Sequence, residues 1–251
     1  MPRFSANLTL LFTELGVLKR FQAAADAGFT GAEFLFPYDV KVADLAKACG
    51  DAGLDWVLMN CPPPNWAGGP RGFAAVPDHQ DRFRRDFERS MRVAEALNST
   101  HLHIMSGKAS GPQAYDTMVE NLIWAADRAP HISLTIEPIN QDHMPGYFLS
   151  DFGLAMDILD AVNAPNLAMQ FDAYHAQVIT GDMMACWDQV RRRVRHIQIA
   201  GWPGRHEPNR GRLDYPAFFD RLDADGYKGW VSAEYNPHFR TDGGLDWLPK
   251  G

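Results

Sequence analysis

The amino-acid sequence predicts a single-domain α/β protein folded as a (β/α)8 TIM barrel, because short apolar segments alternate eight times with longer segments of helical period. The short segments begin on average about 32 residues apart, which is the length of one βα unit. No linker or low-complexity stretch interrupts the 251 residues, so residues 1–251 are expected to form one domain. An open, doubly wound sheet would show the same alternation and is the alternative.

The short segments, which are apolar or alternate between apolar and polar residues, are the predicted strands. They are Arg3–Asn7, Gly31–Phe36, Asp55–Asn60, His101–Met105, Ser133–Glu137, Leu167–Asp172, His196–Ile199 and Trp230–Glu234. The segments between them carry apolar residues at helical spacing, and several end at a glycine or before a proline, as helices commonly do. The predicted helices are Glu14–Ala27, Val42–Ala52, Gln80–Leu97, Gln113–Ala129, Gly153–Val162, Met183–Val194 and Pro216–Asp225.

The composition argues against several classes of protein. The chain has 24 Lys and Arg against 31 Asp and Glu, a formal net charge of −7, whereas binding to nucleic-acid phosphates or to an anionic membrane needs clustered cations. No run of about eighteen apolar residues occurs, so no membrane span is expected. Three scattered cysteines (Cys49, Cys61 and Cys186) predict reduced thiols. Because the first residues contain no signal-peptide core, a cytoplasmic location is expected.

Two predicted strand-to-helix loops are long, Cys61–His79 and Ala200–Leu213, while the helix-to-strand connections are short. In a (β/α)8 barrel the strand-to-helix loops all lie at the end where active sites form, and long loops in compact domains commonly carry function. The first loop contains Trp66 between a run of prolines and a pair of glycines. Trp66 is predicted to belong to a lid that closes over the site, and a rigid cap packed on the barrel is the alternative.

The last four predicted strands each deliver one oxygen-bearing side chain: Glu137, Asp172, Gln198 and Glu234. Their spacings of 35, 26 and 36 residues are each close to one βα unit, so the four should meet at one rim of the barrel. Any one of them alone would more often be a helix cap or an ion-pair partner. Three converging carboxylates repel one another, and a cation is the natural compensation. Oxygen ligands favour Mg²⁺ or Mn²⁺ over Zn²⁺.

These residues belong to a set of motifs that resembles a known family. The motifs are Arg3–Asn7, Glu33–Tyr38, Ile136–Asn140, Met144–Tyr147, Gln170–His175, His196–Ala200, Gly204–Pro208 and Gly229–Tyr235. Over nearly its whole length the chain is similar to the hydroxypyruvate isomerase family of xylose isomerase-like TIM barrels. The resemblance implies that Glu137, Asp172, Gln198 and Glu234 bind the metal and that Glu137 and Glu234 also form the acid/base pair. It leaves the substrate open, because the family includes 2-oxotetronate isomerases and the wider fold includes ketose 3-epimerases.

Conversion of hydroxypyruvate to tartronate semialdehyde, the reaction that the resemblance implies first, requires a proton to move between two adjacent carbons. A divalent ion that chelates the neighbouring oxygens would acidify the C–H bond and stabilise the enediolate. Arg205 is the candidate for binding the substrate's carboxylate, because a guanidinium matches a carboxylate in shape and charge. Pairing with Glu207 on the surface is the alternative.

Three further residues are candidates for contacts with the substrate, each with a structural alternative. His175 follows Asp172 by three residues and is expected to hydrogen-bond the substrate, to cap the next helix or to support a ligand. His103 and Lys108, around the end of the fourth predicted strand, are substrate-binding candidates whose alternative is a core or solvent role. The expected partner is a small molecule, either a 3-hydroxy-2-oxo acid or a ketose. Exposed aromatic residues and the resemblance are both compatible with a homo-oligomer.

Two other function classes remain as alternatives. A metal-dependent hydrolase or endonuclease would be expected to carry many histidine ligands and a basic groove, which this acidic chain lacks in its sequence pattern. A non-catalytic metal- or sugar-binding protein would keep the ligands but would not need two glutamates placed as an acid/base pair.

Overall fold

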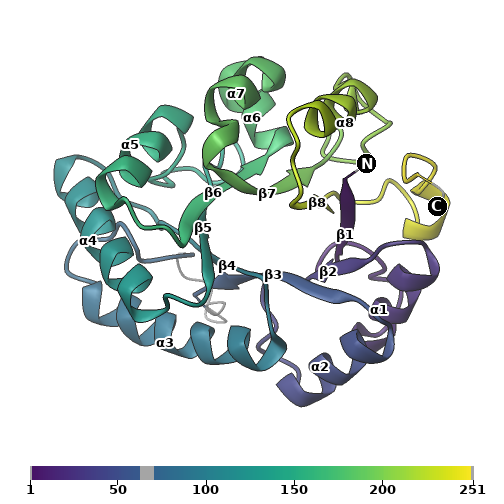
Figure 1. Ribbon diagram of the computed structural model, residues 1–251, viewed down its shortest axis with the longest axis horizontal. Helices are drawn as coiled ribbons and strands as arrows, with labels where there is room; N and C mark the ends of the chain where they lie inside the picture. The colour runs from purple at the N-terminus through teal and green to yellow at the C-terminus, as the bar shows by residue number, and fades with distance from the viewer. Residues whose placement is uncertain (1, 63–70, 250–251) are drawn as a thin grey trace.

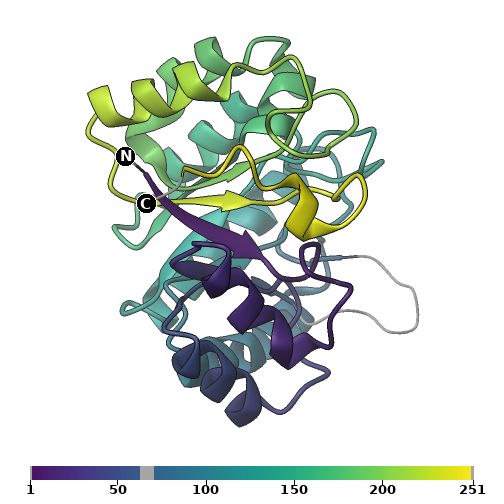
Figure 2. The same cartoon turned by 90° about the vertical axis from the view of Figure 1, so that its right-hand side faces the viewer.

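The computed structural model describes residues 2–62 and 71–249 and shows eight parallel strands closed into a barrel, with helices around the outside (Figure 1). The strands are β1 Arg3–Asn7, β2 Gly31–Glu33, β3 Asp55–Cys61, β4 His101–Ile104, β5 Ser133–Ile136, β6 Leu167–Asp172, β7 Val194–Ile199 and β8 Trp230–Ala233. Figure 2 shows β1 beside β8, and the two pair in parallel with Phe4 opposite Val231. This pairing closes the sheet. The predicted (β/α)8 TIM barrel is therefore confirmed, and the open sheet is excluded.

The helices lie where amphipathic segments cover the strands. They are α1 Val17–Asp26, α2 Val42–Asp51, α3 Gln80–Leu97, α4 Pro112–Arg128, α5 Phe152–Val162, α6 Ala173–Thr180, α7 Met183–Val190 and α8 Tyr215–Ala224, with 3₁₀ turns at Arg191–Arg193 and Thr241–Gly244. In α3, Phe83, Phe87, Met91 and Ala94 recur every three or four residues and are all buried. This spacing places them on one face of the helix. None of the helices in the described ranges is both long and apolar enough to cross a membrane.

Some predicted elements need correction. The helix predicted from Glu14 begins at Val17. Helix α6 was not expected, because it follows β6 without a loop; the side chain of Asp172 caps it by accepting hydrogen bonds from the backbone N–H groups of Tyr174 (2.7 Å) and His175 (3.1 Å). The predicted helix Met183–Val194 ends at Val190, and Val194 already pairs with β6 as the first residue of β7. Strand β2 ends at Glu33 instead of extending to residue 36.

The interior of the barrel is polar at its carboxyl end. Six strands each contribute one buried polar side chain there. Hydrogen bonds join Asn7 to Glu33, Glu33 to Gln198 and Gln198 to Gln170, and a further one joins His103 to Asn60. The apolar core lies outside the strands, where rings such as those of Phe171, Trp187 and Phe218 pack edge to face or tilted against one another. The site is therefore built into the end of a rigid, well-packed sheet.

The loop after β3 returns to the barrel rim through residues 71–79. Gly72 has a φ of +92°, and a Cβ atom there would lie 2.4 Å from the carbonyl oxygen of Met105, so the close approach requires glycine. The backbone N–H of Ala75 donates to the carbonyl of Ser106 at 2.8 Å. These contacts hold the loop against the segment after β4. Residues 63–70 of the same loop, with Trp66, lie outside the described residues, and the predicted lid is therefore untested.

Candidate active site

The four predicted oxygen ligands lie at the carboxyl end of neighbouring strands. Glu137 directly follows β5, Asp172 ends β6, Gln198 lies in β7, and Glu234 directly follows β8. Their exposed fractions are 5%, 1%, 0% and 8%, so all four are buried. The parallel strands carry them to one rim because the sheet closes in sequence order.

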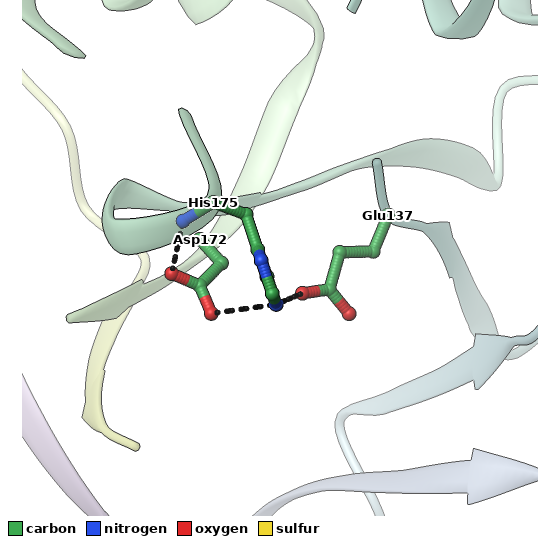
Figure 3. Close-up of side chains that lie close together, drawn as sticks. All are labelled: Glu137, Asp172 and His175. Carbon is green, nitrogen blue, oxygen red and sulfur yellow. Dashed lines mark hydrogen bonds and ion pairs between the residues drawn. The ribbon is translucent and has the colours of Figure 1, made fainter. Parts of the chain in front are cut away.

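Three of the buried side chains at this rim form a group that could hold a metal ion: Glu137, Asp172 and His175 (Figure 3). One ligand atom from each lies within 4.8 Å of the others. The Nε2 atom of His175 is 3.6 Å from Oδ2 of Asp172 and 3.9 Å from Oε1 of Glu137. Carboxylate and imidazole groups at these distances are compatible with a divalent cation.

The ring of His175 is oriented from its other side. The side-chain amide of Asn140 donates to Nδ1 of His175 at 2.6 Å, and the Asn140 side-chain oxygen accepts from the backbone of His143 at 3.0 Å, which fixes the amide. Because Nδ1 accepts, the neutral ring carries its proton on Nε2 and directs that N–H toward the carboxylates. In this tautomer Nε2 is a hydrogen-bond donor, and it would bind a metal only after losing this proton. Burial lowers the pKa of His175 to about 4, so the ring is neutral at pH 7.

Amide side chains connect the carboxylates beneath this group. Gln170 donates from Nε2 to Oε2 of Glu137 at 2.9 Å and to Oε1 of Gln198 at 2.7 Å. Gln198 in turn donates to Glu33 at 3.0 Å and to Glu234. Its amide nitrogen, rather than its oxygen, thus faces Glu234. Ligation of a metal through the oxygen of Gln198 stays a prediction.

Arg205 lies between two of the carboxylates. Its Nη2 atom donates to Oδ2 of Asp172 and to Oε1 of Glu234, both at 2.9 Å, and Nη1 donates to Nδ1 of His143 at 3.2 Å. The residue has a φ of 55°, in the left-handed region, and its N–H and C=O are held by Gly201 and Asn236. Arg205 is not paired with Glu207, the alternative partner; its role toward the substrate stays a prediction.

The site has an excess of buried negative charge. Burial, then Asp172, then Glu234, raise the pKa of Glu137 well above its usual value. Burial also raises the pKa of Glu234, although Arg205 opposes the shift. Burial likewise raises the pKa of the nearby Glu33 to about 8. Among the described side chains at this site one guanidinium faces these carboxylates, so the donor set fits a further cation.

Known proteins place the chain in a family. A family described as "Xylose isomerase-like TIM barrel" matches residues 21–251. The chain is 41% identical to a 2-oxo-tetronate isomerase of Cupriavidus necator over 99% of this chain and 98% of that protein. It is 38% identical to the hydroxypyruvate isomerase of Escherichia coli, also over 99% and 98%. The chain belongs to this isomerase family of TIM barrels. The resemblance seen in the sequence motifs is confirmed.

Solved structures show the same fold. A Brucella melitensis protein described as "AP endonuclease, family 2" superposes with a TM-score of 0.95 at 43% identity, covering 99% of this chain and 98% of that chain. A D-allulose 3-epimerase from Methylomonas sp. gives a TM-score of 0.75 at 20% identity, covering 96% of this chain and 86% of that chain. At that identity the epimerase shares the fold alone.

In this isomerase-family barrel Glu137 and His175 of the buried group line a cavity of about 440 Å³. Its described lining consists of Leu10, Leu35, Phe36, Asn60, Arg71, His103, Met105, Glu137, Ile139, Asp142, His143, Met144, Gln170, His175, Arg205 and Glu234. The predicted substrate contact His103 lies on this wall; its Nε2 is 3.7 Å from Oε2 of Glu137, and its Nδ1 lies 3.1 Å from Oδ1 of Asn60. Lys108 is exposed and is not brought to the cavity, and its backbone bridges to Tyr147.

Sequence reasoning missed several residues at the site, among them Asn7, Glu33 and Arg71. Asn7 and Glu33 end β1 and β2, so the strand-end rule used for the later strands would have found them. For Glu33 the predicted strand was three residues too long, which placed it in mid-strand. Arg71 lies in a loop, and no local pattern indicates that its side chain reaches the cavity.

Proposed function

We propose that this protein is a divalent-metal-dependent isomerase of 3-hydroxy-2-oxo acids. The observation that carries the proposal is the buried group Glu137, Asp172 and His175. Glu137 and His175 line a cavity together with Glu234, whose carboxylate shares the Arg205 guanidinium with Asp172. Relatives at 38–41% identity are named for this type of activity. Because the cavity wall is acidic, an acid substrate needs a cationic contact of its own there.

Glu137, Asp172, Gln198 and Glu234 are the proposed ligands of Mg²⁺ or Mn²⁺, with Gln198 turning its oxygen toward the ion. Once bound, the ion would polarise the substrate's C2 and C3 oxygens and acidify the C3–H bond. The chain's own residues then move the protons. One of Glu137 and Glu234 takes the proton from C3 and returns it to C2, while the other serves the proton that moves between the oxygens.

The environment of the two glutamates suits proton transfer. Because burial raises both pKa values, each carboxyl group holds its proton to a higher pH than a free glutamate does. The Nε2–H of His175, directed into the site by Asn140, is the proposed hydrogen-bond donor to a substrate oxygen. Arg205 keeps Asp172 and Glu234 in place and offsets part of their charge.

Within the family we propose 2-oxo-tetronate as the preferred substrate and hydroxypyruvate as the second candidate. The relatives of 41% and 40% identity are named 2-oxo-tetronate isomerase, against 38% for the hydroxypyruvate isomerase of Escherichia coli and 39% for a putative hydroxypyruvate isomerase of Homo sapiens. A cavity of about 440 Å³ has room for the fourth carbon of the longer acid. This order reverses the one that the motifs alone suggested.

An endonuclease activity, for which the Brucella melitensis protein is named, is disfavoured here by the charge of the site. A phosphate backbone requires a cationic surface, whereas the cavity wall carries Glu137, Asp142 and Glu234 against two arginines.

The test is proton exchange in heavy water, followed by NMR, on hydroxypyruvate, 2-oxo-tetronate and a set of neutral ketoses. We expect exchange at C3 of both acids and faster turnover of 2-oxo-tetronate. Chelation should abolish exchange, and Mg²⁺ or Mn²⁺ should restore it. Full activity in metal-stripped protein would rule out the metal proposal. Exchange confined to ketoses would identify a sugar epimerase instead.

A further inference from the structure

Five charged side chains line the cavity within the described ranges: Arg71, Arg205, Glu137, Asp142 and Glu234. A substrate that carries a carboxylate is expected to pair with a cation among them, because an unpaired charge in a partly enclosed cavity is costly. The other three are carboxylates, so the cation must be Arg71 or Arg205. These two arginines differ in the groups that they already contact.

Arg205 is occupied. Its Nη2 donates to both Asp172 and Glu234, Nη1 donates to His143, and its side chain is only 16% exposed. A substrate carboxylate placed against this guanidinium would also face the two protein carboxylates. To bind it, Arg205 would have to give up contacts that hold the acid residues of the site.

Arg71 is exposed on the opposite side of the barrel mouth. It follows β3, while Arg205 follows β7, four strands away in a closed sheet of eight. Its guanidinium carbon lies 5.8 Å from the ring centroid of Phe36, another cavity residue. Within the described parts of the chain, no carboxylate is paired with Arg71.

The backbone beside Arg71 is held in place. Gly72 is packed against the carbonyl of Met105, where no side chain would fit, and Ala75 is hydrogen-bonded to Ser106. A guanidinium beside an anchored backbone, with one face against an aromatic ring and no carboxylate partner among the described residues, is suited to bidentate binding of a carboxylate.

We propose that Arg71 binds the substrate's carboxylate and thereby selects 2-oxo acids over neutral ketoses. The substrate then lies across the cavity, with its carboxylate toward β3 and its reacting carbons toward Glu137 and Glu234. This inference rests on the proposed function. It gives Arg71 the contact that the sequence suggested for Arg205, and it leaves Arg205 as a positioning residue for Asp172 and Glu234.

The experiment compares substrates that differ only in charge. Erythrulose is 2-oxo-tetronate with a hydroxymethyl group in place of the carboxylate, and dihydroxyacetone has the same relation to hydroxypyruvate. For Arg71→Gln in the Mg²⁺-loaded full chain we expect kcat/KM to fall about 10- to 100-fold on the acids, mainly through KM. Exchange into the ketoses should not change. Arg71→Lys should recover part of the loss because it restores charge without the planar fork.

The matched control is Arg212→Gln. Arg212 is also exposed and also lies over an aromatic ring, that of Trp202 at 5.7 Å, but it does not line the cavity. Its removal should leave the acid and ketose rates unchanged. A second readout is the dissociation constant of D-glycerate, a non-reacting acid, by calorimetry. Arg71→Gln should weaken it by the same factor as KM.

The outcomes separate this inference from the proposed function. If the wild-type protein isomerises neither acid but binds glycerate through Arg71, the function fails and the inference stands. If acids are turned over normally by Arg71→Gln, or if acids and ketoses lose activity equally, the inference is wrong. Selective loss on acids in Arg205→Ala, with Arg71→Gln unaffected, would overturn it in favour of Arg205. A wild-type protein that neither binds glycerate nor acts on acids would overturn both.

Discussion

The two halves of the barrel contribute differently to the same site. Strands β5–β8 and their loops carry the acidic and cationic groups that face one another, namely Glu137, Asp172, His175, Arg205 and Glu234. Strands β1–β4 contribute mostly neutral groups that reach these residues from beneath or beside them: Asn7, Asn60 and His103, with the carboxyl group of Glu33 among amides. The later half holds the charges that face one another, and the earlier half, apart from Arg71, orients them.

The difference has a physical reason. Carboxylates placed around the whole rim would repel one another without an intervening cation, while amide donors can orient a carboxylate by hydrogen bonds without adding charge. Asn7, for example, donates to Oε2 of Glu234 at 2.9 Å from the far side of the β1–β8 seam. Apart from Arg71, the comparison therefore predicts large losses of activity from changes in the later half and moderate losses from changes in the earlier half.

The largest effect is expected from the two glutamates of the later half. Glu137→Gln and Glu234→Gln keep the size of the side chain but remove the group that accepts a proton. We expect kcat to fall at least about 100-fold for each, the usual scale for a positioned acid or base. Circular dichroism should show the fold retained. Near-normal turnover in either variant would mean that this glutamate is a ligand or a structural residue only.

Glu207→Gln is the matched control for these variants. Glu207 is also a buried glutamate at the barrel mouth, where it accepts from the backbone of His238 at 3.0 Å, but it does not line the cavity. Because glutamine retains an oxygen that can accept this bond, activity should stay within about threefold of wild type. A loss of activity as large as that of Glu137→Gln would indicate that removing any buried negative charge at the barrel mouth disrupts the site.

Metal affinity should depend on pH because of the two glutamates in the later half of the barrel. Because the pKa values of Glu137 and Glu234 are raised, protons occupy these carboxyl groups as the pH falls and compete with the cation. Affinity for Mn²⁺ measured by calorimetry should therefore rise between pH 6 and pH 8, by up to about tenfold per pH unit for each proton displaced. Binding should release protons into the buffer.

The pH dependence of metal affinity can also show which half of the barrel binds the cation. The pKa of Glu33 is also raised, to about 8, but its carboxyl group accepts from Asn7 and Gln198, which an amide in its place could still do in part. We expect Glu33→Gln to retain the pH dependence of metal binding and Glu234→Gln to flatten it. The reverse result would assign the cation to the earlier half.

Asn7→Ala should have a moderate effect, since it removes a hydrogen bond to Glu234 without removing a reactive group. We expect kcat to fall about tenfold with little change in KM, the scale typical of groups that orient a ligand. Ser5→Ala is the control from the same strand, because Ser5 is buried two residues earlier and its hydroxyl has no partner among the described residues. Unchanged kcat in Asn7→Ala would show that Glu234 is held by other contacts.

The sequence was sufficient to predict the architecture, because a (β/α)8 barrel repeats one local unit and each unit carries its own hydrophobic period. The ends of β6 and β7, and hence Asp172 and Gln198, could be located from that period alone. Helix α6 could not, since it begins without a loop and depends on the Asp172 side chain for its cap. Local propensity does not indicate that an acidic residue at the end of a strand will do two things. One oxygen of Asp172 caps the next helix, while the other faces Arg205 and His175 in the site.

Side-chain orientation was beyond the sequence for a different reason. The amide of Gln198 is turned by Gln170 and Glu234, which come from neighbouring strands, and Arg205 is directed onto carboxylates 29 and 33 residues away. Such contacts exist only after the barrel has closed. Spacing could predict that the groups meet at one rim, but it could not predict which atoms face each other.

The smallest effect is expected at Lys108, in the earlier half. The sequence made it a candidate for binding the substrate because it follows β4, but its side chain is exposed and it does not line the cavity. Lys108→Met keeps the length of the side chain and its aliphatic stem, and the backbone bridge to Tyr147 does not involve the ammonium group. We expect kcat/KM on the acids to stay within about twofold of wild type, because an exposed charge outside the site contributes little to binding. A tenfold loss of kcat/KM on the acids, with ketose exchange unchanged, would instead mean that Lys108 joins Arg71 at the substrate's carboxylate. Two cations of the earlier half would then bind the substrate, and the division between a charged half and an orienting half would no longer hold.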